Sequence, residues 1–365
     1  MPHALPPRLV SLADYERAAS EVLDPGALSY IAGGATDEVT LQDNVAAWRR
    51  LALRPRILVG VGRRDPSVEL LGVRRPHPLL IAPMAFQGLV HGDGEIATAR
   101  AAAASSTIMC LSTLATTSPE ALAEAVPVAP RWFQLYVFAD RGVSRDLVAR
   151  AVEHGYEALV VTVDLPVFGL RERELRSGVG SAHAERVPIA AAAGASGAMT
   201  AAGFAELVDP DLRWSDIEQF AAESSLPVLV KGILTAEDAR RAVAHGVSGV
   251  IVSNHGGRQL DTVLSGADAL PAIADAVGDQ LDVLVDGGIR RGTDVVKALA
   301  LGARAVLIGR PVLWGLAVDG APGAQRVIET LLTELDNALA LAGSPQASSL
   351  DATFVTPAPW PDQRR

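Results

Sequence analysis

The strongest constraint on the fold is an alternation of short apolar runs with alanine-rich stretches, which begins near residue 79. The intervening stretches, such as TAEDARRAVAHG, open on a helix-capping residue or glycine and close on glycine, as helix ends favour. Eight βα units of this kind predict a closed (β/α)₈ TIM barrel over residues 79–340 rather than an open sheet. The eight expected strands are LLIAPMA (79–85), IMCLST (108–113), RWFQLYV (131–137), EALVVTVD (157–164), PVLVKGI (227–233), GVIVSN (249–254), LDVLVDG (281–287) and AVLIGR (305–310).

The remainder of the chain is expected to complete one domain over residues 1–365. Residues 1–60 predict an N-terminal helical segment, with an amphipathic helix around Leu12 to Val22, a break at Gly33-Gly34 and a helix from Asp37 to Leu53. The connection from Pro166 to Trp214 is too long for an ordinary βα loop. It predicts an active-site lid at about residues 167–213.

Composition excludes several classes of partner. With 49% hydrophobic residues the chain can bury a large core, and a net charge of −10 argues against a nucleic-acid or anionic-membrane surface.

The single cysteine, Cys110, lies in an apolar run, so no intrachain disulfide is expected and a reducing compartment is favoured. The stretch from Ile189 to Gly203 is interrupted by Gly and Ser and predicts a loop, not a membrane span. No secretion signal is recognised, and the chain is expected to be cytoplasmic.

Polar residues follow nearly every predicted strand. In this fold the chemistry lies at the carboxyl ends of the strands, so these side chains are expected to converge on one face. Lys231 is notable because the chain has only two lysines among its 32 lysines and arginines. A positive charge beside core-like flanks therefore indicates a specific role. The strand-end residues are Ser112, Gln134, Tyr136, Thr162, Asp164, Lys231, Ser253, His255, Asp286 and Arg310.

His255 differs from the other histidines. His154 and His245 each precede a glycine at a predicted helix end, where a structural role is expected. His255 follows a strand, lies beside two glycines that let the backbone approach a ligand, and precedes Arg258 by three residues. The planar guanidinium of Arg258 suits recognition of a carboxylate.

Glycine-containing turns follow the last two strands, as DGGIRRG (286–292) and IGRP (308–311). This is the usual location of a phosphate group in the fold, because backbone N–H groups and arginines provide positive potential there. The two turns together predict a phosphate-bearing cofactor.

Several motifs together resemble one family. They are YIAGGATDE (30–38), LRPR (53–56), IAPMA (81–85), FQLYV (133–137), TVDLP (162–166), KGI (231–233), SNHGGRQLD (253–261), DGGIRRG and IGRP. With these motifs the whole chain resembles the FMN-dependent 2-hydroxyacid oxidases and dehydrogenases, the group of glycolate oxidase, lactate oxidase and mandelate dehydrogenase. Its amino-acid sequence is most similar to those of hydroxymandelate oxidases, and the nonapeptide around His255 is the most specific motif.

The resemblance implies a role for each matching residue and implies no metal. His255 would be the catalytic base paired with Asp164, and Tyr136 and Lys231 would complete the catalytic set. The substrate would contact Tyr30, Tyr136, Arg171, His255 and Arg258. FMN would contact Pro83, Met84, Ala85, Ser112, Gln134, Thr162, Lys231 and Ser253, with its phosphate on Asp286, Gly287, Gly288, Ile289, Arg290, Gly309 and Arg310.

The implied reaction is oxidation of an (S)-2-hydroxy acid to the 2-oxo acid, with oxygen reduced to hydrogen peroxide, in a homotetramer or octamer. Such a reaction needs a cationic clamp, a base and an electron acceptor. Plant glycolate oxidases have a tryptophan where this chain has Leu114 and an arginine where it has Leu170. Together with Phe168, these differences predict a roomier apolar pocket and a substrate such as mandelate or 4-hydroxymandelate.

Two alternatives remain open at this level. A dehydrogenase could pass electrons to a quinone or cytochrome, although no haem domain or membrane-binding segment is recognised and Ala85 is the oxidase-like residue beside the flavin. A flavin barrel of another kind, such as an isomerase or an IMP-dehydrogenase-like protein, shares KALALGARAV and DGGIR. A silent FMN-binding protein is a further alternative. The sequence also leaves open whether His255 removes the carbon proton or the hydroxyl proton.

Overall fold

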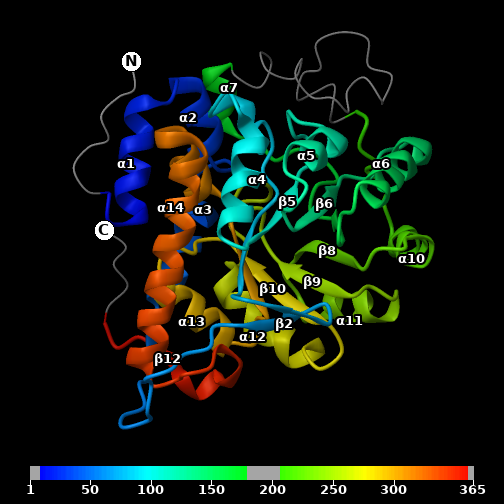
Figure 1. The fold of residues 1–365 in the computed structure, drawn as a ribbon. Helices are drawn as coiled ribbons and strands as arrows, with labels where there is room; N and C mark the ends of the chain where they lie inside the picture. Colours follow the sequence, from blue (N-terminus) through cyan, green and yellow to red (C-terminus); the bar gives the residue numbers. More distant parts are fainter. Residues whose placement is uncertain (1–8, 179–205, 361–365) are drawn as a thin grey trace.

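Eight parallel strands form a closed barrel in the computed structural model, which describes residues 9–178 and 206–360. Each strand pairs with its sequence neighbour, and β11 pairs with β4 to close the ring (Figure 1). The predicted (β/α)₈ barrel is therefore confirmed. Its strands are β4 (Leu79–Ile81), β5 (Ile108–Leu111), β6 (Arg131–Leu135), β7 (Leu159–Thr162), β8 (Val228–Ile233), β9 (Gly249–Val252), β10 (Asp282–Asp286) and β11 (Ala305–Ile308).

Alternate residues of these strands fill the inside of the barrel, and the others pack against the surrounding helices. Leu80, Cys110, Trp132 and Leu229 belong to the inner cluster, so Cys110 is a core residue as expected. Burial on both faces explains why the strands read as continuous apolar runs. The barrel helices are α4 (Gly94–Ala104), α5 (Pro119–Ala125), α6 (Arg141–Glu153), α10 (Trp214–Glu223), α11 (Ala236–Ala244), α12 (Gly266–Val277), α13 (Gly292–Ala300) and α14 (Arg310–Ala342).

The N-terminal segment is helical, as expected, and comprises α1 (Leu12–Val22), α2 (Pro25–Ala32) and α3 (Val39–Arg49). Helix α1 packs along α14 (Figure 1). The expectation that the last helix reaches Leu53 is wrong. Leu51–Leu53 instead forms strand β1, which pairs antiparallel with β12 (Val355–Pro357) near the far end of the chain. The buried Lys297 fixes the end of α3, because its Nζ donates to the Trp48 carbonyl at 2.7 Å.

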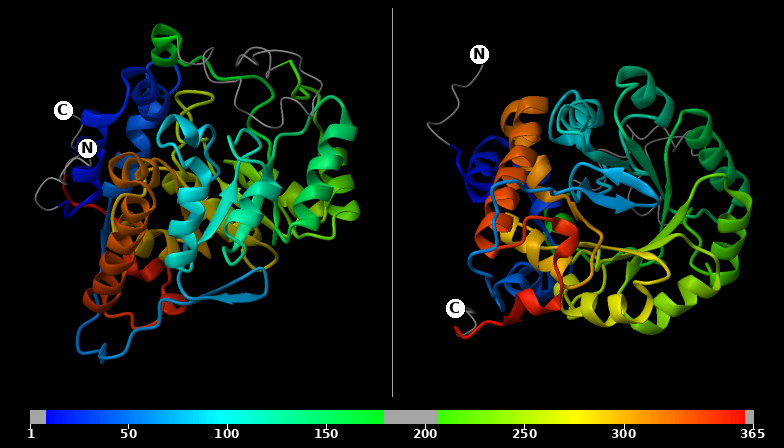
Figure 2. Two further views of the ribbon diagram at one scale, coloured as in Figure 1. Left: turned by 45° about the horizontal axis from the view of Figure 1, so that its top comes forward. Right: turned by 60° about the horizontal axis from the view of Figure 1, so that its bottom comes forward.

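A small hairpin closes the amino-terminal end of the barrel. Strands β2 (Val68–Leu70) and β3 (Val73–Arg75) are antiparallel, and the hairpin lies across the middle of the helical ring (Figure 2, right). Leu70 packs into the inner cluster of the barrel, and the Leu71 N–H donates to the Asp282 carboxylate at 2.6 Å. The inside of the barrel is thereby filled from below, and the opposite end carries the site.

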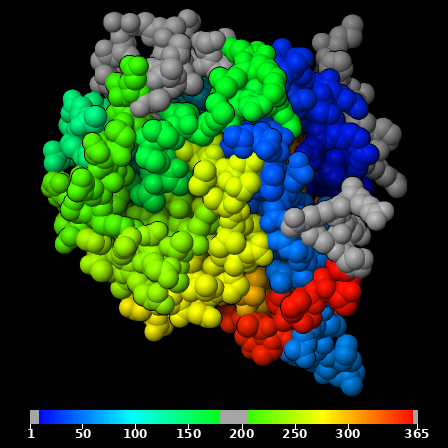
Figure 3. Space-filling view, turned by 180° about the vertical axis from the view of Figure 1, so that it is seen from behind, coloured from blue at the N-terminus to red at the C-terminus, as the bar shows by residue number. Residues whose placement is uncertain are grey.

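The expected lid is described in part. Its first section contains α7 (Glu172–Ser177), which packs on α2, so the lid section lies beside the N-terminal helices (Figure 3). Residues 179–205 of the expected lid lie outside the described residues. The described residues also contain three short 3₁₀ helices, η1 (Gln87–Leu89), η4 (Ala347–Ser349) and η5 (Ala352–Phe354).

Candidate active site

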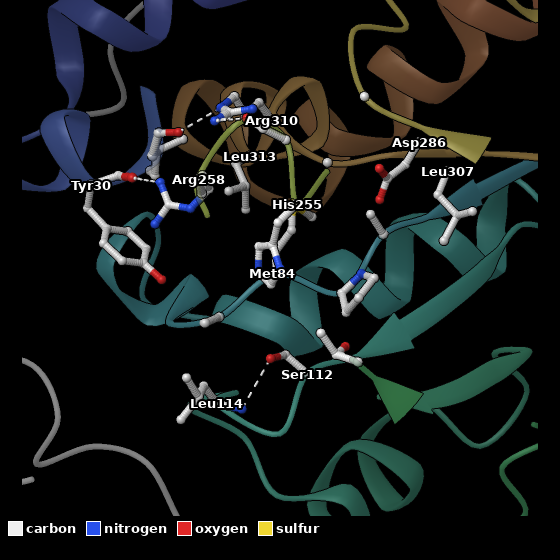
Figure 4. A pocket seen from close by; sticks show the side chains of 18 of the residues that line it. Tyr30, Met84, Ser112, Leu114, His255, Arg258, Asp286, Leu307, Arg310 and Leu313 are labelled. Atoms are coloured by element: carbon white, nitrogen blue, oxygen red, sulfur yellow. Dashed lines mark hydrogen bonds between the residues drawn. The ribbon is translucent and has the colours of Figure 1, made fainter. Parts of the chain in front are cut away.

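A large cavity opens at the carboxyl ends of the barrel strands. It has a volume of about 1490 Å³, part of it open to solvent. In Figure 4, Tyr30 and Arg258 lie on one side of the cavity and Asp286 and Leu307 on the other.

Nearly all of the residues predicted from the sequence line this cavity. The lining includes Tyr30, Pro83, Met84, Ala85, Ser112, Tyr136, Thr162, Arg171, Lys231, His255, Arg258, Asp286, Gly287, Gly288, Ile289, Arg290, Gly309 and Arg310. Three predicted residues, Gln134, Asp164 and Ser253, lie behind it. Each of them hydrogen-bonds a residue that does line the cavity, namely Ser112, His255 and Lys231 respectively.

His255 is presented by an unusual turn after β9. Its φ of 59° is left-handed, and Gly256 and Gly257 continue in the same region at 66° and 74°. A Cβ on Gly257 would lie 2.6 Å from the Leu41 backbone nitrogen, so only glycine fits there. The left-handed conformation of a non-glycine residue is a local strain of the kind found at functional sites. Here it accompanies an imidazole placed between two polar partners.

Those partners are Asp164 and Tyr136. The Nδ1 of His255 lies 2.9 Å from Oδ1 of Asp164, which follows β7, and Nε2 lies 3.4 Å from the Tyr136 hydroxyl. With Asp164 holding Nδ1–H, Nε2 is the nitrogen that can accept a proton on the cavity side. The pair has the arrangement of a general base with a carboxylate behind it.

The charge states of the pair follow from burial and mutual attraction. Burial lowers the pKa of His255 below its usual 6.5, and the nearby Asp164 offsets this only in part. For Asp164 burial acts in the opposite direction, but the hydrogen bond from His255 and the positive charge of Lys231 outweigh it and lower the pKa. The imidazole is therefore neutral at neutral pH, while the carboxylate behind it is ionised.

Lys231 lies at the end of β8 with its side chain fully enclosed. Its Nζ lies 3.1 Å from Oδ2 of Asp286 and donates to the Ser253 hydroxyl at 2.8 Å. Burial alone would lower the pKa of Lys231, but the carboxylates of Asp286 and Asp164 outweigh it and raise the pKa. The wall of the cavity thus carries a charged ammonium at neutral pH.

Two arginines, Arg171 and Arg258, form what we call the arginine pair. The Nη1 of Arg258 donates to the carbonyls of Tyr30 and Gly33 at 2.6 and 3.1 Å, and its guanidinium lies over the Tyr30 ring at 4.8 Å. The Nε of Arg171 donates to the Arg258 carbonyl at 3.1 Å. Both guanidiniums line the cavity on the same side as Tyr30, where they can bind an anionic group.

Sequence reasoning missed Glu174, which also lines the cavity. Its Oε2 lies 3.5 Å from Arg171 and 3.7 Å from Arg258, so one carboxylate oxygen faces both members of the arginine pair. The residue lies in α7, three positions after Arg171. That spacing is the signal that could have indicated it, since residues three apart on a helix are neighbours. Glu174 balances part of the positive charge of the pair.

The opposite part of the cavity is built for an anion. Gly287 and Gly288 have φ values of 94° and 78°, and a Cβ on Gly288 would lie 1.8 Å from the Asn44 carbonyl oxygen. Arg290 and Arg310 flank this turn, and among the described residues neither is ion-paired to a carboxylate within 4.0 Å. Burial, with repulsion from Arg258 and Arg290, lowers the pKa of Arg310 to about 9. Two partly buried guanidiniums with neutral partners suit a phosphate group.

Gln134 provides a further test of the fit to FMN. Its Oε1 accepts from the Ser112 hydroxyl and the Thr113 N–H at 3.2 and 3.1 Å. Its Nε2 is buried and has no hydrogen-bond partner among the described residues. A buried donor of this kind normally has a partner, and the polar edge of a flavin ring beside Ser112 would supply an acceptor. The residues present therefore fit both ends of FMN.

The apolar wall differs partly from expectation. Leu114 is buried and lines the cavity together with Phe86, Leu89 and Phe168. Leu170 does not contribute: its side chain is 57% exposed and lies outside the lining, so its expected role in the pocket is wrong. The loop before Arg171 turns Phe168 inward and Leu170 outward, a direction that an irregular segment does not reveal in its sequence.

The fold and the site together define a class: a flavin-dependent (β/α)₈ barrel with a histidine–aspartate pair and cationic groups at its strand ends. A family model described as FMN-dependent dehydrogenase matches residues 19–357. The chain belongs to this FMN-dependent family, and the resemblance drawn from the motifs is confirmed.

Individual relatives agree with this assignment. The chain is 49% identical to an L-lactate oxidase from Nostoc sp., over 95% of this chain and 98% of the relative. It is 44% identical to human 2-hydroxyacid oxidase 1, over 96% and 97% of the two chains. A solved structure of mandelate oxidase with (S)-2-phenylpropionate superposes with a TM-score of 0.86 at 42% identity, covering 96% of this chain and 98% of that one.

Proposed function

We propose that this protein oxidises an (S)-2-hydroxy acid to the 2-oxo acid and reduces oxygen to hydrogen peroxide. The observation that carries the proposal is that His255 Nε2 and the arginine pair face one cavity. A base and a carboxylate-binding site at short range are what removal of hydrogen beside a carboxylate requires. FMN, when bound, supplies the acceptor for the two electrons that leave the substrate.

Each neighbouring residue has a role in this proposal. The arginine pair and Tyr30 hold the substrate carboxylate, and Tyr136 lies where it can bind the hydroxyl side. Whether the carbon proton or the hydroxyl proton is removed, the accepting atom is Nε2 of His255. Asp164 then stabilises the imidazolium, because an adjacent carboxylate favours the charged form. The ammonium of Lys231 favours negative charge on its side of the cavity.

The cavity wall supports a bulky or aromatic substrate. Leu114, Phe86 and Phe168 form an apolar surface on this wall. Such a surface offers no hydrogen-bonding group to a small polar substrate. Several solved relatives are described as mandelate oxidase, one of them with (S)-mandelic acid. We therefore infer that mandelate or 4-hydroxymandelate is a better substrate than glycolate.

We expect anaerobic addition of (S)-mandelate to bleach the bound flavin faster than (S)-lactate, and lactate faster than glycolate. Extra apolar surface buried against the wall contributes about 25 cal/mol per Å², which favours the aromatic acid. The measurement is flavin absorbance across a panel of S and R acids. A higher kcat/KM for glycolate than for mandelate would contradict the substrate inference, and a preference for R acids would contradict the stereochemistry.

Leu114→Trp provides a matched control for this prediction. A larger side chain at this buried position removes space from the wall but leaves the arginine pair and His255 unchanged. The ratio of kcat/KM for mandelate over glycolate should fall by about tenfold, within the range that apolar pocket changes achieve. Equal losses for both acids would point to misfolding instead.

The electron acceptor is tested separately. Among the described residues, no helix is long and apolar enough to cross a membrane. Turnover in air should release close to one hydrogen peroxide per 2-oxo acid, and an artificial dye should not be required. A rate that depends on the dye, with little peroxide, would favour a dehydrogenase that passes electrons to a quinone or cytochrome.

Two other predictions accompany the proposal. A homotetramer or octamer and a cytoplasmic location stay predictions, which sizing of the purified holoenzyme and cell fractionation would test. A flavin that no 2-hydroxy acid bleaches would favour an isomerase or a silent FMN-binding protein.

A further inference from the structure

Gln259, the residue directly after Arg258, makes an unusually complete set of contacts. Its Nε2 donates to the carbonyls of Asp164 and Val167 at 2.9 and 3.0 Å. Its Oε1 accepts from the Gly169 N–H at 3.2 Å and from Nη2 of Arg171 at 3.1 Å. Both amide hydrogens and both lone pairs are used, and the side chain is only 9% exposed.

All four contacts fall on one segment, residues 164–171. This segment begins with the carboxylate behind the proposed base and ends with one member of the arginine pair. It has no strand or helix of its own before Glu172, so its shape depends on contacts to other parts of the chain. Gln259 meets it at four points along its length.

The same segment lies tightly on the backbone of Gln259. A Cβ on Gly169 would lie 2.4 Å from the Arg258 carbonyl oxygen and 2.7 Å from the Gln259 Cα. The close approach leaves no room for a side chain, so the segment and the 258–259 backbone are held at a fixed spacing. The segment is therefore closely packed against the 258–259 backbone and does not rest loosely on the surface.

The guanidinium of Arg171 is fixed by this arrangement. Its Nε donates to the Arg258 carbonyl, its Nη2 to Gln259, and its Nη1 faces Glu174 at 3.5 Å. Without Gln259 the guanidinium would lose the only neutral side-chain acceptor that it has among the described residues, and it could turn toward the carboxylate of Glu174. The face that it presents to the cavity would change.

We propose that Gln259 is a positioning residue, which fixes the substrate-binding guanidinium of Arg171 relative to the His255–Asp164 pair. This inference rests on the proposed function. Gln259 is not among the residues that line the cavity. It acts by joining the anion-binding side of the site to the proton-accepting side through one amide.

Two substitutions distinguish the role of the amide NH₂ group of Gln259 from that of its oxygen. Gln259→Met keeps the approximate length but loses all four hydrogen bonds. Gln259→Glu keeps an acceptor for Gly169 and Arg171 but loses both donors to the carbonyls of Asp164 and Val167. Arg131→Met is the stability control, because Arg131 is also buried and donates to several loop carbonyls, but at the amino-terminal end of the barrel.

The readouts are the Kd of a 2-oxo acid, followed by the absorbance of the bound flavin, the kcat for bleaching, and thermal unfolding. Benzoylformate and pyruvate serve as probes. For Gln259→Met we expect Kd to rise about tenfold and kcat to fall by up to about 100-fold, since small displacements from a reactive geometry have effects of this size. For Gln259→Glu we expect Kd within about threefold of wild type, but a lowered kcat.

A purely structural role gives a different pattern. Gln259→Met would then unfold at a lower temperature, like Arg131→Met, with Kd and kcat unchanged in the folded holoenzyme, and the proposal would be overturned. An increase in Kd of similar size in Gln259→Glu would also overturn it, because that variant retains the acceptor for Arg171. If Gln259→Met does not fold, the Glu variant decides between these outcomes.

Failure of the proposed function can be recognised in the wild type. If 2-hydroxy acids do not bleach its flavin and 2-oxo acids do not perturb it, the function is wrong and the inference on Gln259 falls with it. If the wild type is bleached normally and the Met variant binds 2-oxo acids equally well, only the inference on Gln259 is overturned.

Discussion

Replacing His255 with glutamine should leave FMN bound but slow substrate bleaching by about 10²- to 10⁴-fold, the usual contribution of a positioned general base. Glutamine can still hydrogen-bond to Asp164, but it cannot accept the substrate proton. The flavin contacts proposed for Lys231, Ser112 and the glycine turn are untouched by this change. Stopped-flow absorbance under anaerobic conditions measures the rate, and the yellow colour after gel filtration measures retention of FMN.

The matched control is His245→Gln, since His245 lies at the end of α11 beside Glu218 and away from the cavity. It should bleach at the wild-type rate. The pH profile is a second check: the neutral imidazole is the base, and burial lowers its pKa, so kcat/KM should stay high at neutral pH and fall only as the pH drops below 6.5. Persistent bleaching in His255→Gln would remove the assignment of the base.

Arg258→Met should lower kcat/KM for mandelate by about 10²- to 10⁴-fold. Two charge-assisted hydrogen bonds to a carboxylate contribute about 1.5–3 kcal/mol each, and methionine provides neither. Arg258→Lys should recover part of the loss because it restores the charge without the planar geometry. Steady-state kinetics with both variants measure the effect.

An uncharged substrate distinguishes binding of the carboxylate from general damage. Arg258 also donates to the carbonyls of Tyr30 and Gly33, so its loss loosens the N-terminal segment. Mandelamide lacks the carboxylate charge, and its oxidation should fall much less than that of mandelate in Arg258→Met. Equal losses for the two substrates would mean that Arg258 supports the fold of the site and does not bind the carboxylate.

The barrel could be predicted because its evidence is local. Each strand is a short apolar run with a polar residue just after it, and parallel topology brings all the carboxyl ends to one face. For this reason residues as far apart as Ser112, His255 and Arg310 could be expected to meet, whereas Tyr30, which lies in α2, was expected there only from the family resemblance. The family motifs then predicted the chemical roles of these residues.

The errors came from features that depend on distant partners. The run Leu51–Leu53 continues a helical pattern, but β12, about 300 residues later, recruits it into a sheet. The orientation of Leu170 depends on how the lid section folds over α2, for which the sequence gives no periodic signal. Gln259 was part of a recognised motif, yet its four contacts depend on the path of an irregular loop.

Both lysines of this chain are buried: Lys231 is 4% exposed and Lys297 is 8% exposed. One is enclosed by Asp286 and Ser253, and the other is bonded to the end of α3. Reagents that acylate amines therefore meet no exposed lysine on the folded protein, and its surface cations are arginines. Labels, crosslinkers and resins that couple through lysine side chains would reach these two residues only when the protein unfolds. Modification of the two lysines, measured separately from that of the α-amino group, would therefore report loss of the native barrel.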